Sequence, residues 1–323
     1  QRLAALFDTH EDDFILVAQK LETWCLGGCQ AKSGVDTFYD TPSAADKEDA
    51  VATMIFNAWY GRFLSGVFGD ESLPSGIWFP TGDSGRQRTI TRLMEGRGSG
   101  NPENIASWDP TTGESVFFDD QRTAIIESSD EVALMALVDA LAFLRSSPTG
   151  PGQGGFGSDV MDEWLWGLRH WVRFESVLAE LVGSDPTFAV FTDPFAISPE
   201  RLPLAQNLTS TDPRYGLPGF PRNGDQLNVD AANPGTSGVR FNYGSGPVFR
   251  MVVALGPDGA EGVNILPGGQ SGLKDSAHFD DQAALWLGND TWPMRFTVDD
   301  VVAGAISRET FTGTVNTNET TDP

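Results

Sequence analysis

Residues 262–296 constrain the fold of this chain more than any other stretch of its 323 residues. The short apolar run at residues 263–266 predicts a buried strand. The sequence PGGQSG at residues 267–272 then predicts a tight polar turn, because glycine permits positive φ and a close approach of the backbone. Short helices are expected at residues 283–287 and from Asp299 onward. The stretch is therefore expected to run from strand to turn to helix.

Ser271 and His278 raise the hypothesis of a serine hydrolase, which the spacing tests. A nucleophile elbow has the pattern G-x-S-x-G, but the residue two positions after Ser271 is Leu273. The members of a catalytic triad also converge from distant segments, whereas these residues are close together in the sequence. The sequence therefore favours a buried polar turn over a catalytic serine.

His170 ends a W-x-W-G-x-x-H element at residues 164–170 and is a candidate acid or base. No carboxylate or cysteine stands at a spacing that would make it part of a catalytic pair. The sequence therefore favours a packed, hydrogen-bonded histidine beside two tryptophans.

Helix signals dominate the first half of the chain. Ser43 and Ser128 each stand three positions before an acidic residue and predict capping boxes, the first of them opening a helix that runs to about Phe68. Thr9 is expected to cap a helix near the start of the chain. Residues 226–230 alternate between polar and apolar and predict a strand.

The motifs at residues 267–272 and 278–282, Trp286 and the PMRF segment at residues 293–296 follow one another in a specific order and spacing. In type, order and spacing they resemble the carboxyl-terminal signature of the penicillin acylase family. The element at residues 164–170 resembles a second signature of the same family. The family comprises amidohydrolases whose nucleophile is the amino-terminal serine of a self-cleaved β chain.

The resemblance spans about residues 2–305 and implies an α+β fold. This would be part of an αββα N-terminal-nucleophile hydrolase fold, with a helical first half followed by sheet strands and short helices. The whole chain, residues 1–323, would be a single incomplete domain from the carboxyl-terminal part of a β chain. Residues 1–147 would form a mostly helical shell, residues 158–308 a helix and central-sheet strands, and residues 309–323 a tail.

The chemistry implied by the resemblance needs an amino-terminal serine whose own α-amine acts as the base. Gln1 cannot serve in this role, so we expect a fragment whose nucleophile lies upstream and which is inactive alone. The asparagine of the oxyanion hole and the calcium ligands of some members also match no position here. No residue of this chain is therefore assigned as catalytic, cofactor-binding or metal-binding, and calcium is considered only for the full enzyme.

The expected partners are the α chain and the remainder of the β chain of the same precursor. The expected substrate is a small N-acyl amide, such as a β-lactam with an acyl side chain or an acyl-homoserine lactone. The expected location is periplasmic or extracellular. The alternative hypothesis is a non-catalytic carbohydrate- or solute-binding module, which would not require both motifs together.

Composition excludes two kinds of partner. The chain carries 45 acidic and 21 basic residues and a formal net charge of −24, which repels nucleic acid and anionic membranes. No apolar run is long enough for a membrane-spanning helix.

The two cysteines, Cys25 and Cys29, are separated by a spacer that contains two glycines. They lack the second pair that a zinc site needs. The flexible spacer would allow a disulfide, and two free thiols remain the alternative. Cys25 also stands where the resembling family has an aspartate.

Overall fold

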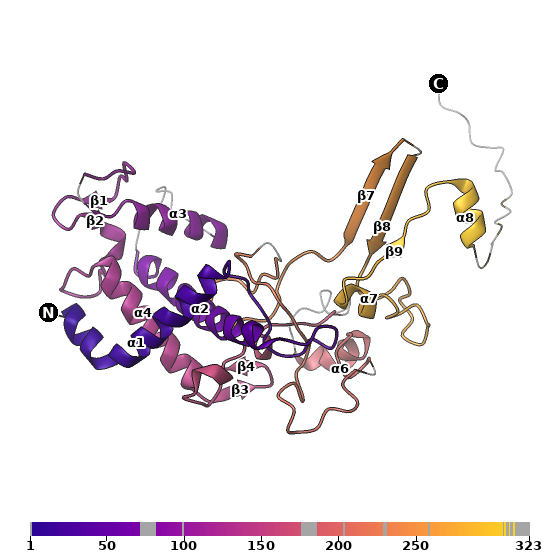
Figure 1. Ribbon diagram of the computed structural model, residues 1–323, viewed down its shortest axis with the longest axis horizontal. Helices are drawn as coiled ribbons and strands as arrows, with labels where there is room; N and C mark the ends of the chain where they lie inside the picture. Colours follow the sequence, from indigo (N-terminus) through magenta and orange to yellow (C-terminus); the bar gives the residue numbers. More distant parts are fainter. Residues whose placement is uncertain are drawn as a thin grey trace. The chain divides into compact units, whose positions relative to one another are not determined.

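The computed structural model describes residues 2–71, 82–98, 100–175, 186–202, 204–228, 231–257 and 259–305, together with residues 307, 310 and 313. The chain separates into two compact units, residues 1–247 and 248–323. Helices and small antiparallel sheets are both present, so the α+β class predicted from the sequence is confirmed (Figure 1).

Helices form the framework of the first unit, where α2 (Ala44–Phe68) packs on α1 (Arg2–Leu26), α3 (Asp83–Glu95) and α4 (Ser129–Arg145). Both predicted capping boxes are confirmed. In each, the serine hydroxyl accepts a hydrogen bond from a backbone N–H in the first turn, and an acidic side chain accepts one from the serine backbone. These reciprocal bonds satisfy donors that every helix start leaves open.

The predicted cap at Thr9 is wrong. The Thr9 hydroxyl instead donates to the carbonyl of Ala5, 2.7 Å away, as it would inside a helix. The chain direction changes one residue later, at His10, where φ is −126° and ψ is 20°. The sequence therefore indicated a break in this region but assigned it to the wrong residue and the wrong hydrogen bond.

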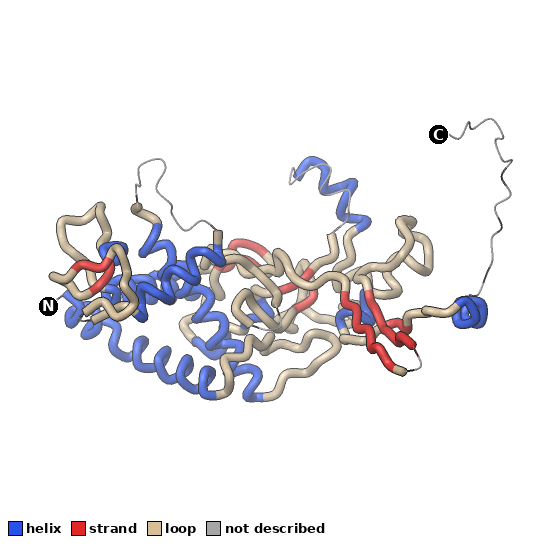
Figure 2. The backbone as a smooth tube through the Cα atoms, turned by 90° about the horizontal axis from the view of Figure 1, so that it is seen from above, coloured by secondary structure: helices blue, strands red, loops and turns tan. Residues whose placement is uncertain are grey.

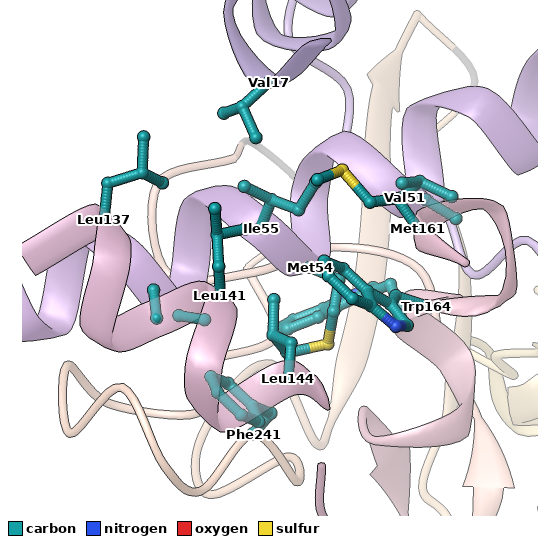
Figure 3. Close-up of a cluster of buried hydrophobic side chains, with 14 of the residues drawn as sticks. Val17, Val51, Met54, Ile55, Leu137, Leu141, Leu144, Met161, Trp164 and Phe241 are labelled. Carbon is teal, nitrogen blue, oxygen red and sulfur yellow. The ribbon is translucent and has the colours of Figure 1, made fainter. Parts of the chain in front are cut away.

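The core of the first unit lies between α1, α2 and α4 and is closed by an aromatic segment from further along the chain (Figure 3). Met54 and Ile55 of α2 face Leu141 and Leu144 of α4, and all four side chains are buried. Trp164 fills the space beside them and is fully buried. Apolar burial of this kind is the main favourable contribution to folding.

The rest of the first unit consists of loops, short helices and two-stranded ladders. The ladders pair β1 (Trp108–Asp109) with β2 (Glu114–Ser115), β3 (Pro148–Gly150) with β4 (Gln153–Gly154), and β5 (Trp171–Val172) with β6 (Phe220–Pro221). The short helices are η1 (Val116–Phe118), η2 (Met161–Glu163), η3 (Trp166–Leu168), η4 (Pro186–Phe188), α6 (Ala189–Thr192) and η5 (Asp193–Phe195).

The strand predicted at residues 226–230 is not formed. Residues 226–228 make bends, and residues 229 and 230 lie outside the described part of the chain. The side chain of Asp225 explains the bends, because it accepts hydrogen bonds from the backbone N–H groups of Leu227 (2.8 Å) and Asn228 (2.9 Å). Such a local side-chain acceptor favours a turn over an extended ladder.

The second unit is built on a three-stranded antiparallel sheet in the order β7-β8-β9. Its strands are β7 (Arg250–Gly256), β8 (Gly259–Ile265) and β9 (Trp292–Pro293), and its helices are α7 (Ala283–Leu287) and α8 (Val298–Gly304). Figure 2 shows β7 and β8 as paired strands in red. The predicted strand ending at residue 265 and both predicted helices are confirmed.

Burial is uneven across this sheet. Ile265 is fully buried, but residues 251–256 of β7 are all exposed, including Val252 and Leu255. β7 therefore has apolar side chains that no described residue of its own unit covers.

Cys25 and Cys29 form a disulfide across the end of α1, with their Cα atoms 4.1 Å apart. The turn between them is made possible by Gly28, whose φ is +95°. Of the two alternatives, a disulfide or two free thiols, the structure has the disulfide. No helix in the described ranges is both long and apolar enough to span a membrane.

Shortening Leu141 tests the position of the core. Leu141→Ala removes buried contacts between α2 and α4 and should lower the free energy of unfolding by about 2–5 kcal/mol. Leu26→Ala is the matched control, because Leu26 is 83% exposed and its truncation should change stability by less than about 0.5 kcal/mol. Chemical denaturation followed by circular dichroism measures both, and equal losses would contradict this assignment of the core.

Candidate functional site

The W-x-W-G-x-x-H element places His170 in a closed aromatic environment in the first unit. His170 is fully buried, and its ring stacks on Trp166 with 4.5 Å between the ring centroids. Its Nδ1 lies 2.5 Å from the carbonyl oxygen of Phe241. Because a carbonyl only accepts, Nδ1 carries the hydrogen. The prediction of a packed, hydrogen-bonded histidine is confirmed.

Burial lowers the pKa of His170 to about 4, since charging the ring would require a cation away from water. The hydrogen bond to Phe241 and the charge of Asp225 oppose this shift but are smaller than the effect of burial. Nε2 has no hydrogen-bond partner among the described residues. The ring is therefore neutral at pH 7 and has no water-exposed face, which makes it unsuitable for exchanging protons with a substrate.

The neighbours of this element hold it in place within the first unit. The indole N–H of Trp166 donates to the carbonyl of Gly224 at 2.9 Å, and the backbone N–H of Gly167 donates to Ser33 at 2.7 Å. A Cβ on Gly167 would collide with the Ser33 side chain, so only glycine permits this approach. The element therefore joins three distant segments of the first unit.

Arg169 holds the glycine-rich linker at residues 148–157 and was not singled out from the sequence. Its Nε donates to the carbonyl of Gly154 at 2.8 Å and its Nη2 to that of Gly155 at 2.6 Å. The guanidinium also lies 4.1 Å from the centre of the Phe156 ring. Burial lowers the pKa of Arg169 to about 10, so the group remains charged at pH 7.

The PGGQSG turn lies beside a cavity of about 890 Å³ in the second unit. Its lining includes Ser271, Ser276, His278, Asp281, Trp292 and Arg295. The cavity is formed entirely by residues of this unit. Polar groups that converge on one concave surface are the usual mark of a binding site.

His278 and Asp281 form a hydrogen-bonded pair in this cavity, with His278 Nδ1 2.9 Å from Asp281 Oδ2. The link to Ser271 is made through the backbone, because the Ser271 N–H donates to the His278 carbonyl at 2.9 Å. The Ser271 hydroxyl oxygen accepts from the N–H of Leu273 at 3.1 Å. Among the described residues no hydrogen bond joins that hydroxyl to the His278 ring. The three residues share a cavity, but they do not form the relay of a catalytic triad.

Gly268 and Gly269 of the turn have different roles. The positive φ expected of the turn belongs to Gly268, at +87°. Gly269 is required for a different reason, since a Cβ there would fall on the carbonyl oxygen of His278 and lie 2.8 Å from Asp281 Oδ1. The turn is tight as predicted, but the expectation that it is buried is wrong, because residues 267–272 lie beside a cavity and are half-buried or exposed. At Gly269 the constraint is close approach and not backbone conformation.

The remaining members of the signature bind one another. Gln282 accepts from the N–H of Leu266 at 3.2 Å through its side chain and donates to the carbonyl of Gly268 at 2.9 Å through its backbone. The guanidinium of Arg250 lies 4.1 Å from the centre of the Trp286 ring and donates to the Trp286 carbonyl at 2.8 Å. These residues fix the turn and α7 against β7 and β8, so their role in this unit is structural.

No group of three or more His, Cys, Asp or Glu side chains in the described ranges is arranged to hold a metal ion.

A family model described as penicillin amidase matches residues 5–303, which include both motifs. The chain therefore belongs to the penicillin amidase family, a family of amidohydrolases with the N-terminal-nucleophile hydrolase fold. The resemblance inferred from the two signatures is confirmed. No curated protein matches the chain.

The burial of His170 makes stability dependent on pH. Its pKa is about 4 in the folded state and about 6.5 when unfolded, so between these values the unfolded chain binds a proton that the folded chain does not. Stability should therefore fall as the pH is lowered from about 6.5 to about 4, by up to about 3 kcal/mol. His170→Gln removes this titration, so the difference in unfolding free energy between wild type and variant should shrink through that window. Parallel curves for the two proteins would contradict the assignment.

Gly269 should be intolerant of any side chain. Gly269→Val forces the turn away from the His278 carbonyl and should lower the stability of the second unit by about 1–3 kcal/mol. Gly272→Ala in the same turn is the control, because a Cβ there meets no atom within 4 Å. Hydrogen exchange of β8 amides reports on this unit alone. Equal protection in Gly269→Val and wild type would refute the close-approach explanation.

Proposed function

We propose that the protein cleaves the linear amide bond of small N-acyl substrates, of the β-lactam side-chain or acyl-homoserine lactone type. The observation that carries this proposal is the family match over residues 5–303, which contains both signatures. The hydrogen bonds made by Gln282, Trp286 and Arg250 support the family assignment behind this proposal, because they show the signature residues acting together to hold the turn and α7 in place.

In this proposal the nucleophile is the amino-terminal serine of a mature β chain, carried by a segment other than the described residues. The pattern of hydrogen bonds supports it, since no serine hydroxyl in the described ranges is bonded to a histidine ring. An amino-terminal serine needs no histidine, because its own α-amine takes the proton during attack.

The same proposal treats the chain as the carboxyl-terminal part of that β chain. Its partners would be the α chain and the remainder of the β chain, and its location the periplasm or the exterior of the cell. The exposed apolar side chains of β7 support a covering partner, because an uncovered apolar strand promotes association. Calcium would belong to the full enzyme.

The complete precursor provides the test. It should be processed into two chains, and amino-terminal sequencing of the larger one should read serine at its first position. The processed protein should hydrolyse phenylacetyl and long-chain acyl anilides, and replacing that serine by alanine should lower kcat by roughly 10⁶-fold. The 323-residue chain by itself should show no turnover. Turnover by this chain that Ser271→Ala abolishes would instead make Ser271 the nucleophile.

A further inference from the structure

The cavity beside the PGGQSG turn has polar groups that neither the amide-cleaving reaction nor the turn requires. Two of them are hydroxyls whose oxygens already accept a hydrogen bond. Ser271 Oγ accepts from the N–H of Leu273, and Ser276 Oγ accepts from the N–H of His278, each at 3.1 Å. Each hydroxyl proton therefore remains available to donate to a ligand in the cavity.

Arg295 supplies a positive charge to the same cavity. Its guanidinium makes no hydrogen bond or ion pair with any residue that the structure describes. Gly304 packs against it, since a Cβ at that position would lie 2.9 Å from the Arg295 Cζ. The charge is thus held at the cavity by contact with the backbone of α8, and no acidic residue in the described ranges pairs with it.

The acidic member of the lining is already engaged. Asp281 binds His278 through Oδ2, and its Oδ1 is buried beside Gly269. Its charge therefore orients the histidine and leaves Nε2 of that ring as the free nitrogen. The net charge of −24 repels anions at long range, but screening at physiological salt reduces it beyond about 8 Å. The groups within the cavity then decide which ligand binds.

One wall of the cavity is apolar, formed by Trp292, Pro293 and Met294. The Trp292 side chain is 49% exposed, which leaves its ring accessible to a ligand. We propose that this cavity binds an organic carboxylate that has an apolar or aromatic body. The carboxylate accepts from Arg295, Ser271 and Ser276, and the body lies against Trp292. This site stands on the cavity alone and does not depend on the proposed amide cleavage.

Three small probes separate the contributions. Benzoate has both the charge and the ring, benzamide has the ring without the charge, and acetate has the charge without the ring. Titration calorimetry on the 323-residue chain should give benzoate an affinity at least roughly tenfold above that of either other probe. Equal binding of benzoate and benzamide, or no benzoate binding at millimolar concentration, would overturn the proposal.

Variants locate the binding. Arg295→Gln should weaken benzoate roughly tenfold and leave benzamide unchanged, and Ser276→Ala should weaken benzoate by a smaller factor. Trp292→Ala should weaken benzoate but not acetate. Arg88→Gln is the matched control, because it removes the same charge from an exposed position on α3. Loss of affinity equal to that of Arg295→Gln in this control would show a general charge effect and refute the site. Hydrogen exchange of the β8 amides in each variant confirms that the second unit is folded.

Discussion

The burial of the segment at residues 164–170 is the interaction on which the first unit depends. Trp164 and Trp166 both enter the core between the helices and are fully buried. Two donors of this segment bind backbone carbonyls of distant segments: the indole N–H of Trp166 donates to Gly224, and Nδ1 of His170 donates to Phe241. A buried donor without such a partner would cost about 1–3 kcal/mol, so the loops must adopt the path that supplies these acceptors. The helices and the long loops are thus fixed by the same residues.

The second unit is organised differently, because its polar signature residues replace a large apolar core. Trp286 is buried, its indole N–H donates to the carbonyl of Val248 at 2.7 Å, and its ring lies under Arg250. Gln282 satisfies the backbone where the strand ends and the turn begins. Beyond Arg250, the side chains of β7 remain outside this arrangement and are exposed. The signature therefore specifies a well-defined turn and helix, while the apolar residues of β7 stay exposed.

The candidate site was only partly accessible from the sequence. The glycines of the turn could be read directly, since glycine has few reasons to recur in this pattern other than turns and close approach. Arg295 was placed in a signature, but neither it nor Trp292 was connected to Ser271 or Ser276. Their meeting at one cavity depends on the pairing of β8 with β9, which brings Asn264 opposite Trp292. The sequence likewise did not predict that Arg169 holds the linker at residues 148–157. Its acceptors are backbone carbonyls, which every residue has, so no sequence pattern marks them.

The sequence by itself determined the α+β class, both capping boxes, the helices that they begin, the turn at residues 267–272 and the family. Each of these depends on residues near one another in the chain or on a pattern of fixed spacing. Tertiary structure alone decided that Cys25 and Cys29 are joined, that residues 226–228 bend around Asp225, and that β7 is exposed. It also decided that the packed His170 binds the carbonyl of Phe241. These outcomes depend on which groups the folded chain brings together. Burial and hydrogen-bond partners are set by those neighbours and cannot be read from a single segment.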